Sequence, residues 1–159
     1  MTRRKTLIAI SAGILAQACG RKSKEGDLAE VINAADPAHA AQLLRGFYPI
    51  EENSWRWTQS KFAMALKPPR RTPNGAVLFL KYSIPEAVLS KLKETTLSAA
   101  VDGIPLQPEK IPQAGMLEYR REVPADDLRG KTGVTVEFTV SPFLPPGDQD
   151  KRELGVIVH

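Results

Sequence analysis

The sequence of 159 residues contains one cysteine, Cys19, and two histidines, His39 and His159. A single cysteine cannot form a disulfide within the chain, which excludes a small disulfide-stapled scaffold. The cysteine and histidine pairs that hold zinc are absent, as is a glycine-rich phosphate loop. Neither histidine lies in a serine or aspartate motif of the kind that acyl transfer uses. We therefore expect no catalytic residues, no metal site and no cofactor.

Long hydrophobic runs are also lacking. The main apolar run, residues 6–15, has about ten residues, and a helix of that length covers only about half of a hydrocarbon core of about 30 Å. It follows the basic residues 3–5 and is followed by residues 16–18, Ala-Gln-Ala, directly before Cys19. This order predicts an export signal over residues 1–18 rather than a membrane span.

The end of this signal resembles the lipobox of bacterial lipoproteins, in which the cysteine thiol receives a diacylglyceryl group. Leu15 lies four positions before Cys19, and Ala16 stands where the motif usually has leucine. The resemblance implies that Cys19 is lipidated, becomes the first mature residue and anchors the protein in the bacterial cell envelope. The alternative is a soluble secreted or periplasmic protein with one free thiol. General secretion is favoured over the twin-arginine route because no aromatic residue follows the arginine pair.

Net positive charge is small once the signal is removed. The whole chain has 22 basic and 18 acidic residues, and the loss of three basic residues leaves 19 against 18. A nearly neutral protein gives no indication of a nucleic-acid partner. Residues 19–26 are small and charged and predict a flexible tether, whose Arg21, Lys22 and Lys24 either are solvated or contact anionic headgroups.

A short helical segment is expected over residues 27–46. Leu28, Val31 and Ile32 have helical spacing, and Asp36 followed by proline is typical of an N-cap. The apolar pair at residues 43–44 ends this run before a glycine. We expect either two short helices or one helix broken at Asp36.

Period-two alternation of apolar and polar residues dominates the remainder, residues 47–159. Strands are predicted at residues 56–66, 76–84, 96–102, 104–106, 117–123, 133–140 and 153–158, with one helical excursion at 85–94. Many short strands without crossover helices predict an all-β fold, an antiparallel β-sandwich of jelly-roll type with a short N-terminal helical segment. The expected core contains Trp57, Phe62, Leu80, Val136, Phe138 and Val156.

Two short motifs suggest a relationship. Residues 46–49, Gly-Phe-Tyr-Pro, precede Glu51, Glu52 and the run 56–58, Arg-Trp-Thr; near the end, residues 150–156 read Asp-x-Arg-x-Leu-Gly-Val. Together they resemble a galactose-binding or carbohydrate-binding-like β-sandwich module of bacterial glycosyltransferases and envelope proteins. The resemblance covers about residues 44–158 and implies a non-catalytic domain. No glycosyltransferase or other enzyme domain accompanies it.

Trp55 and Trp57 are the candidate sugar-stacking residues, since a flat indole suits the apolar face of a sugar ring. Trp57, at the head of an alternating strand, is expected in the core, whereas Trp55 follows a polar stretch and is expected to be exposed and to bind a neutral glycan. The charged residues of the two motifs are expected to form a structural latch between the first and last strands. These are Glu51, Glu52, Arg56, Asp150 and Arg152.

Three functions therefore remain open: a lipoprotein that binds an envelope glycan, a lipoprotein that scaffolds other envelope proteins, and a small hydrolase with two close carboxylates. An exposed Trp55 beside a shallow groove would favour the glycan. A broad apolar patch or an unpaired edge strand would favour the protein partner. The loop at residues 68–75 carries Arg70 and Arg71, which either meet phosphates or are solvated.

Overall fold

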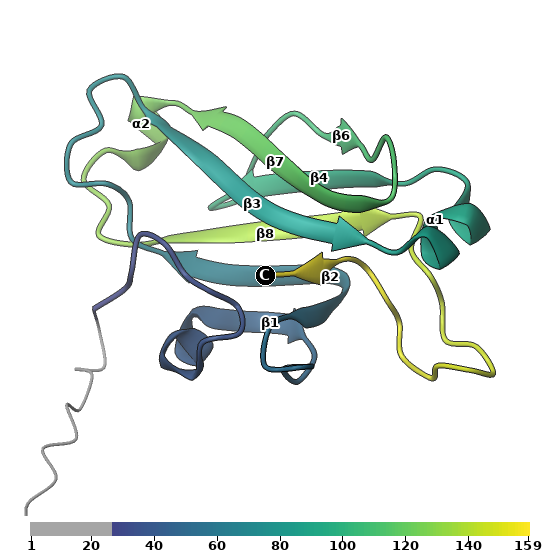
Figure 1. Cartoon of the computed structure of the whole chain (residues 1–159). Coiled ribbons are helices and arrows are strands. Elements are labelled where there is room, and N and C mark those ends of the chain that lie inside the picture. The colour runs from purple at the N-terminus through teal and green to yellow at the C-terminus, as the bar shows by residue number, and fades with distance from the viewer. Residues whose placement is uncertain (1–26) are drawn as a thin grey trace, which may run out of the picture.

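The computed structural model describes residues 27–159; the predicted signal peptide, Cys19 and the tether lie outside the described residues. The described chain is mainly β-structure with three short helices (Figure 1). In chain order the elements are the 3-10 helix η1 (Pro37–Gln42), β1 (Leu43–Phe47), β2 (Arg56–Leu66), β3 (Ala76–Ile84), α1 (Glu86–Leu92), β4 (Thr96–Val101), β5 (Ile104–Pro105), β6 (Glu109–Lys110), β7 (Gly115–Val123), α2 (Ala125–Leu128), β8 (Val134–Ser141) and β9 (Ile157–Val158).

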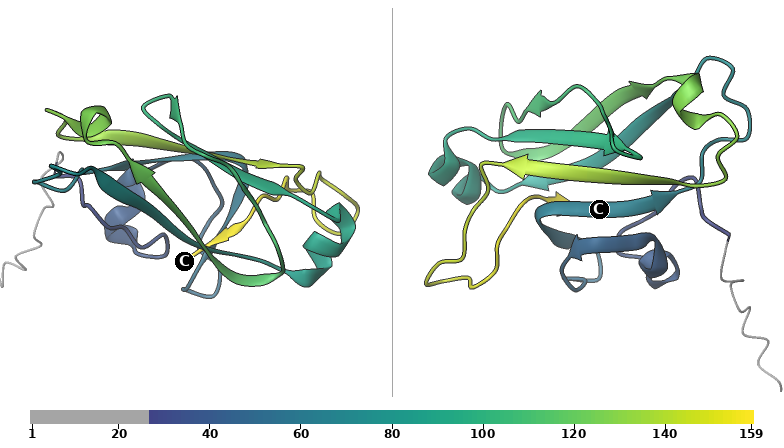
Figure 2. Two further views of the ribbon diagram at one scale, coloured as in Figure 1. Left: turned by 90° about the horizontal axis from the view of Figure 1, so that it is seen from above. Right: turned by 180° about the vertical axis from the view of Figure 1, so that it is seen from behind.

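The strands form one curled antiparallel sheet in the order β5-β4-β8-β2-β9-β3-β7, with β1 attached to β2 and β6 to β4. β2 connects the two parts of the sheet, because it pairs with both β8 and β9. Its first residues, Arg56 and Trp57, pair with β9, and residues 61–66 pair with β8. Beyond β2 the sheet curls, so that β3 and β7 cross over β8 and β4 (Figures 1 and 2). The fold is therefore all-β, as the alternation predicts.

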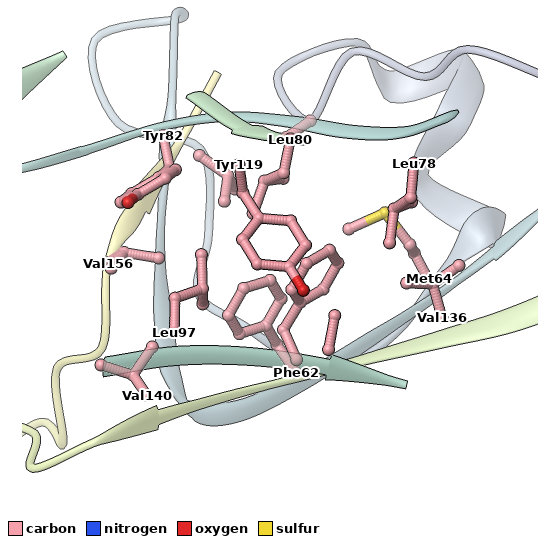
Figure 3. Close-up of a cluster of buried hydrophobic side chains, with 14 of the residues drawn as sticks. Phe62, Met64, Leu78, Leu80, Tyr82, Leu97, Tyr119, Val136, Val140 and Val156 are labelled. Carbon is pink, nitrogen blue, oxygen red and sulfur yellow. The ribbon is translucent and has the colours of Figure 1, made fainter. Parts of the chain in front are cut away.

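The core lies between the two facing parts of this sheet (Figure 3). The Phe62 ring stacks on the Phe138 ring at 5.0 Å between centroids, and Tyr119 of β7 meets Phe138 edge-on at 5.9 Å. This edge contact joins strands from opposite parts of the sheet, and such aromatic pairs contribute about 0.5–1.5 kcal/mol beyond their buried area. All the expected core residues are buried in the same cluster: Trp57, Phe62, Leu80, Val136, Phe138 and Val156.

The N-terminal segment corrects the prediction of helix over 27–46. The cap is confirmed, since Asp36 accepts a hydrogen bond from the backbone N–H of Ala38 at 2.8 Å, but the helix is a single 3-10 element. The apolar residues at 43–44 begin β1 instead of ending a helix. The side chain of Gln42 binds the backbone of Ala29 and Ala65, which fixes this segment along β2. Pairing with β2 therefore outweighs the weak local helical preference.

The last strand is shorter than the predicted 153–158. β9 comprises only Ile157–Val158, and Leu154 forms an isolated bridge with Leu144. Between these pairings, the buried hydroxyl of Thr58 donates to the carbonyl of Val156 at 3.1 Å and accepts from its N–H at 3.0 Å. The Thr58 side chain thus supplies hydrogen bonds that a backbone ladder would otherwise supply where the C-terminal segment meets β2.

Candidate functional site

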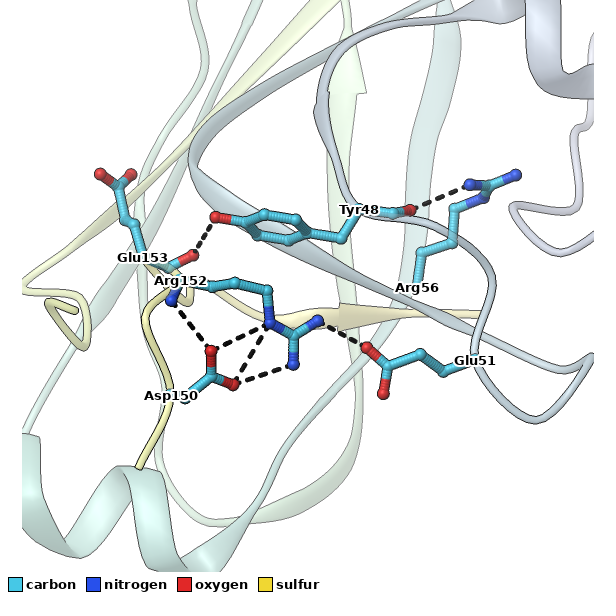
Figure 4. A network of polar contacts seen from close by, with 6 residues as sticks. All are labelled: Tyr48, Glu51, Arg56, Asp150, Arg152 and Glu153. Carbon is cyan, nitrogen blue, oxygen red and sulfur yellow. Dashed lines mark hydrogen bonds and ion pairs between the residues drawn. The ribbon is translucent and has the colours of Figure 1, made fainter. Parts of the chain in front are cut away.

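Arg152 is the centre of a polar cluster that joins the C-terminal loop to the turn between β1 and β2 (Figure 4). Its guanidinium donates to both carboxylate oxygens of Asp150, at 2.9–3.3 Å, and through Nη1 to Glu51 Oε1 at 2.6 Å. It also lies 5.2 Å from the centroid of the Tyr48 ring. The hydrogen bonds from Arg152 lower the pKa of the Asp150 carboxyl, and those to Asp150 and Glu51 raise the pKa of Arg152. This geometry stabilises the ionised forms of Asp150 and Arg152.

The other two members of the predicted latch lie outside this cluster. Arg56 donates through Nε to the carbonyl of Ala34 at 2.6 Å and through Nη1 to the carbonyl of Tyr48 at 2.9 Å. It therefore ties down backbone rather than pairing with a carboxylate. Glu52 is exposed and occupies a left-handed turn position with φ of 49°. Within residues 27–159 neither Glu52 nor Arg56 forms a hydrogen bond or ion pair with Arg152, so the contacts observed around Arg152 involve only Glu51 and Asp150 of the predicted latch.

Two contacts in this region are not indicated by any sequence motif. The Tyr48 hydroxyl donates to the carbonyl of Glu153 at 2.9 Å, and the Glu153 carboxylate accepts from the Ser60 N–H at 2.7 Å. The hydrogen bonds from Ser60 lower the pKa of Glu153. The C-terminal loop is therefore held to β1 and β2 at several points, and only the tertiary fold brings these partners together.

A polar hollow of about 380 Å³ adjoins Arg152. Its wall consists of the C-terminal loop and one side chain of α1. The charged and amide residues among those lining it are Lys91, Asp148, Gln149, Asp150 and Arg152. Such a set can exchange hydrogen bonds with the hydroxyl groups of a sugar.

The two tryptophans are placed differently. Trp57 is buried in the core, as expected, whereas Trp55 is half-buried and packs against the core cluster. The backbone of Trp55 forms a bridge with Glu51, which closes the β1–β2 turn. Trp55 is not among the residues lining the polar hollow at Arg152. The Trp55 indole is therefore half-buried and does not form the exposed stacking surface beside this hollow that is expected from the sequence.

An apolar groove runs along β3, where the curled sheet does not close. It consists of two adjoining hollows of about 320 and 280 Å³ that share Glu30, Val31, Leu66, Val77 and Leu78. Phe79 also lines the first of them. Val77 and Phe79 are 55% and 46% exposed, which is high for apolar side chains that share one hollow. The groove thus leaves apolar surface in contact with water.

The backbone of β3 is unpaired beside this groove. Every residue of Ala76–Ile84 pairs with β7 on one side, but only Tyr82 and Ser83 pair with β9 on the other. No strand within residues 27–159 pairs with residues 76–81 on this second side. β3 therefore has an open edge along most of its length.

The direction of the free backbone groups follows from the alternation of an antiparallel ladder. The carbonyl of Trp57 accepts from the Tyr48 N–H at 2.9 Å, so the backbone groups of Trp57 face β1. Those of the preceding residue, Arg56, must then face β9, where the partner is Val158. Val158 accordingly directs its own N–H and C=O back to β2.

The neighbouring residue of β9, Ile157, then faces β3, where it pairs with Ser83. Because backbone groups alternate along a strand, Val77, Phe79 and Lys81 direct their N–H and C=O groups the same way as Ser83. These three residues have no strand opposite them in the described part of the chain. Their donors and acceptors line the open edge in register with β9.

A serine–histidine contact lies at the end of the same groove. Ser83 Oγ is 2.9 Å from Nε2 of His159, and His159 lines the groove. Burial and the nearby Lys81 lower the pKa of His159. No carboxylate within residues 27–159 hydrogen-bonds this imidazole, so the pair lacks the third group that orients the base in a catalytic triad.

Other described features are limited. Within residues 27–159 no three histidine, cysteine, aspartate or glutamate side chains gather in a way that suits a metal ion. None of the helices in the same residues is long and apolar enough to span a bilayer. The chain matches no protein-family model, and a search of curated proteins finds no significant relative.

Proposed function

We propose that this protein is an exported, lipid-anchored and non-catalytic component of the bacterial cell envelope. In this proposal its sandwich-like β domain, similar to carbohydrate-binding-like modules, presents the apolar groove and the open edge of β3 to another envelope protein. The anchor is supported by the signal-like residues 1–18 and the position of Cys19. A binding role rather than catalysis is supported by the Ser83–His159 pair, which has no hydrogen-bonded carboxylate among the described residues.

The observation that carries the proposal is the open edge of β3 beside exposed apolar side chains. A row of free N–H and C=O groups on a sheet edge accepts an extended strand from a partner, and alternate apolar side chains of that strand would enter the groove. Val77, Phe79 and Lys81 supply the backbone groups, and Val77 and Leu78 the apolar wall. The geometry therefore fits an extended segment of a partner protein better than a sugar ring.

The test uses a photoreactive amino acid at Phe79, introduced into the full chain in living cells. Irradiation is expected to yield a covalent adduct with one envelope protein, identified by mass spectrometry, and a Val77→Asp substitution in the same chain is expected to abolish it. The matched control carries Met116→Asp. Met116 is 52% exposed on β7, similar to Val77 at 55%, but does not line the groove. An adduct that survives Val77→Asp, or no adduct at all, contradicts the proposal.

The lipid anchor has its own test. In the wild type the mature chain is expected to begin at Cys19 with attached acyl chains, measured by mass spectrometry of the N-terminal peptide. Cys19→Ser is expected to move the protein from the membrane fraction to the soluble fraction. An unmodified, soluble wild-type chain would overturn this part of the proposal without affecting the partner test.

A neutral glycan of the envelope is a second candidate ligand, because the hollow at Arg152 is lined by polar groups. Purified peptidoglycan fragments and surface polysaccharides are titrated against the wild type and Gln149→Ala, with Trp55→Ala as the comparison for stacking. Saturable binding weakened several-fold by either substitution favours the glycan. A glycan that competes with the Phe79 adduct would place both ligands at the groove and count against this hollow.

A further inference from the structure

A cationic hollow lies at one end of the sheet, between the β2–β3 loop and the loop that joins α2 to β8. Its volume is about 620 Å³. Four basic residues line it and no carboxylate does: Lys67, Arg70, Arg129 and Lys131. Side chains from two loops, distant in sequence, thus converge with the same sign of charge.

Two of these cations, Lys131 and Lys67, pair with carboxylates that do not line the hollow. Lys131 contacts Asp102 at 2.6 Å, and Lys67 contacts Asp27 at 3.3 Å. The burial of Asp102 opposes its ionisation, but hydrogen bonds from Lys131 and the Thr135 N–H outweigh it and lower its pKa.

The remaining two cations are less constrained. Arg129 pairs with Asp126, and both side chains are highly exposed, so water and salt screen the pair and the guanidinium is available to other anions. Arg70 forms no ion pair with any residue between 27 and 159. The hollow therefore offers two exchangeable guanidinium groups, those of Arg70 and Arg129.

This end of the molecule is also where the described chain begins. The start of the described chain, the β2–β3 loop and α2 lie at one end, and α1 and the C-terminal loop at the other, in all three views (Figures 1 and 2). Asp27 is in contact with Lys67, which lines the hollow. Asp27 lies eight positions after Cys19, and eight residues of chain span at most about 28 Å when extended. A lipid on Cys19 therefore holds this end within that distance of the membrane surface.

We propose that the cationic hollow docks on the membrane and binds the phosphate of an anionic phospholipid headgroup. The proposal rests on the lipid anchoring proposed above, and it is independent of the partner at β3. Guanidinium groups form paired, charge-assisted hydrogen bonds with phosphate oxygens, and Arg70 and Arg129 supply this geometry. Arg21, Lys22 and Lys24 of the tether carry the same sign of charge. Docking in this way directs α1 and the Arg152 hollow away from the membrane.

The test measures co-sedimentation with vesicles, using the full chain processed in cells and carrying Cys19→Ser, so that no attached lipid contributes. Vesicles contain phosphatidylcholine alone or with about 30% phosphatidylglycerol, a fraction that gives a negative surface potential. The protein is expected to bind the anionic vesicles and not the neutral ones. Raising salt from about 50 to about 200 mM is expected to weaken binding, because the charges are screened.

The decisive variant is Arg70→Ser with Arg129→Ser, and its matched control is Lys91→Ser with Lys151→Ser at the opposite end. Both pairs remove two exposed cations. The first is expected to bind anionic vesicles about tenfold more weakly or worse, since each cation near the surface contributes several-fold. The second is expected to bind like the parent chain. Circular dichroism establishes that each variant is folded.

Two outcomes overturn the proposal. Equal losses in both pairs would indicate a response to net charge without a docking site. Unchanged binding of the Arg70→Ser, Arg129→Ser chain, together with loss in a chain whose Arg21, Lys22 and Lys24 are serine, would assign the attraction to the tether alone. Because the assay does not use the lipid on Cys19, its failure is distinct from failure of the anchor.

Discussion

Arg152 and Glu51, which are 101 positions apart in the chain, are joined by a hydrogen bond of 2.6 Å between Nη1 and Oε1. The bond fastens the long loop before β9 to the turn before β2. Because Arg152 also engages both oxygens of Asp150, the guanidinium is held in a fixed orientation. The contact therefore couples the position of the C-terminal loop to the turn between β1 and β2.

Replacing Arg152 should loosen this loop. Arg152→Gln is expected to lower the free energy of unfolding by about 1 kcal/mol, a value limited by solvent screening of a partly exposed group. Backbone amides in residues 142–153 are expected to exchange faster with deuterium. Arg129→Gln, which removes a fully exposed pairing with Asp126, is expected to change stability by less than about 0.5 kcal/mol. Similar effects of the two substitutions would contradict a role for Arg152 as a latch.

The latch should also weaken in acid. The pKa of Asp150 is lowered below its usual 3.8 in the folded protein, so its contribution is present above pH 3.8 and is lost as the pH falls through the folded value. Asp150→Asn is therefore expected to be less stable than the wild type at neutral pH. The difference should shrink below about pH 4. Thermal melts of both proteins from neutral to acidic pH measure it, and a gap that grows in acid would reverse the sign we derive.

Two buried tyrosines provide a matched pair. The Tyr119 hydroxyl donates to the carbonyl of Gln107 at 3.0 Å, whereas the Tyr82 hydroxyl has no partner among the described residues. Burial raises the pKa of Tyr82 to about 12, so its hydroxyl stays protonated and unpaired. Tyr119→Phe is expected to cost about 1 kcal/mol, and Tyr82→Phe to be neutral or slightly stabilising. Denaturant unfolding measures both, and an equal loss would mean that Tyr82 has a partner in solution.

Alanine substitutions at Gly46 and Gly103 allow the cost of backbone strain to be distinguished from the cost of a steric clash. Both have positive φ, +78° and +82°, but a Cβ on Gly46 would lie 2.1 Å from the Lys61 carbonyl oxygen, whereas one on Gly103 meets nothing within 4 Å. Gly103→Ala is expected to cost about 1–2 kcal/mol from the left-handed conformation alone. Gly46→Ala should cost about 1–3 kcal/mol more, because β1 would be pushed from β2. Equal losses in denaturant unfolding would argue against this close approach of the two strands.

The local sequence pattern was sufficient to predict those features of the fold that depend only on residues close in the chain. The strands predicted at residues 56–66 and 76–84 match β2 and β3, and the predicted excursion at 85–94 contains α1. The N-cap at Asp36 and the burial of Trp57 also followed from spacing. Alternation reports which face of a strand is buried, and a proline after aspartate reports where a helix starts, so neither requires knowledge of distant segments.

The sequence by itself thus determined the all-β class, most strands and the buried side chains, because those depend on periodicities of two and 3.6 residues. Tertiary structure alone decided which strand edges remain unpaired and which charged groups meet. It moved residues 43–44 from helix to β1, turned Arg56 to backbone carbonyls, and left β3 open beside Val77 and Phe79. Strand order and loop contacts join residues more than a hundred positions apart, and no local pattern encodes which distant partner a hydrogen-bonding group will find.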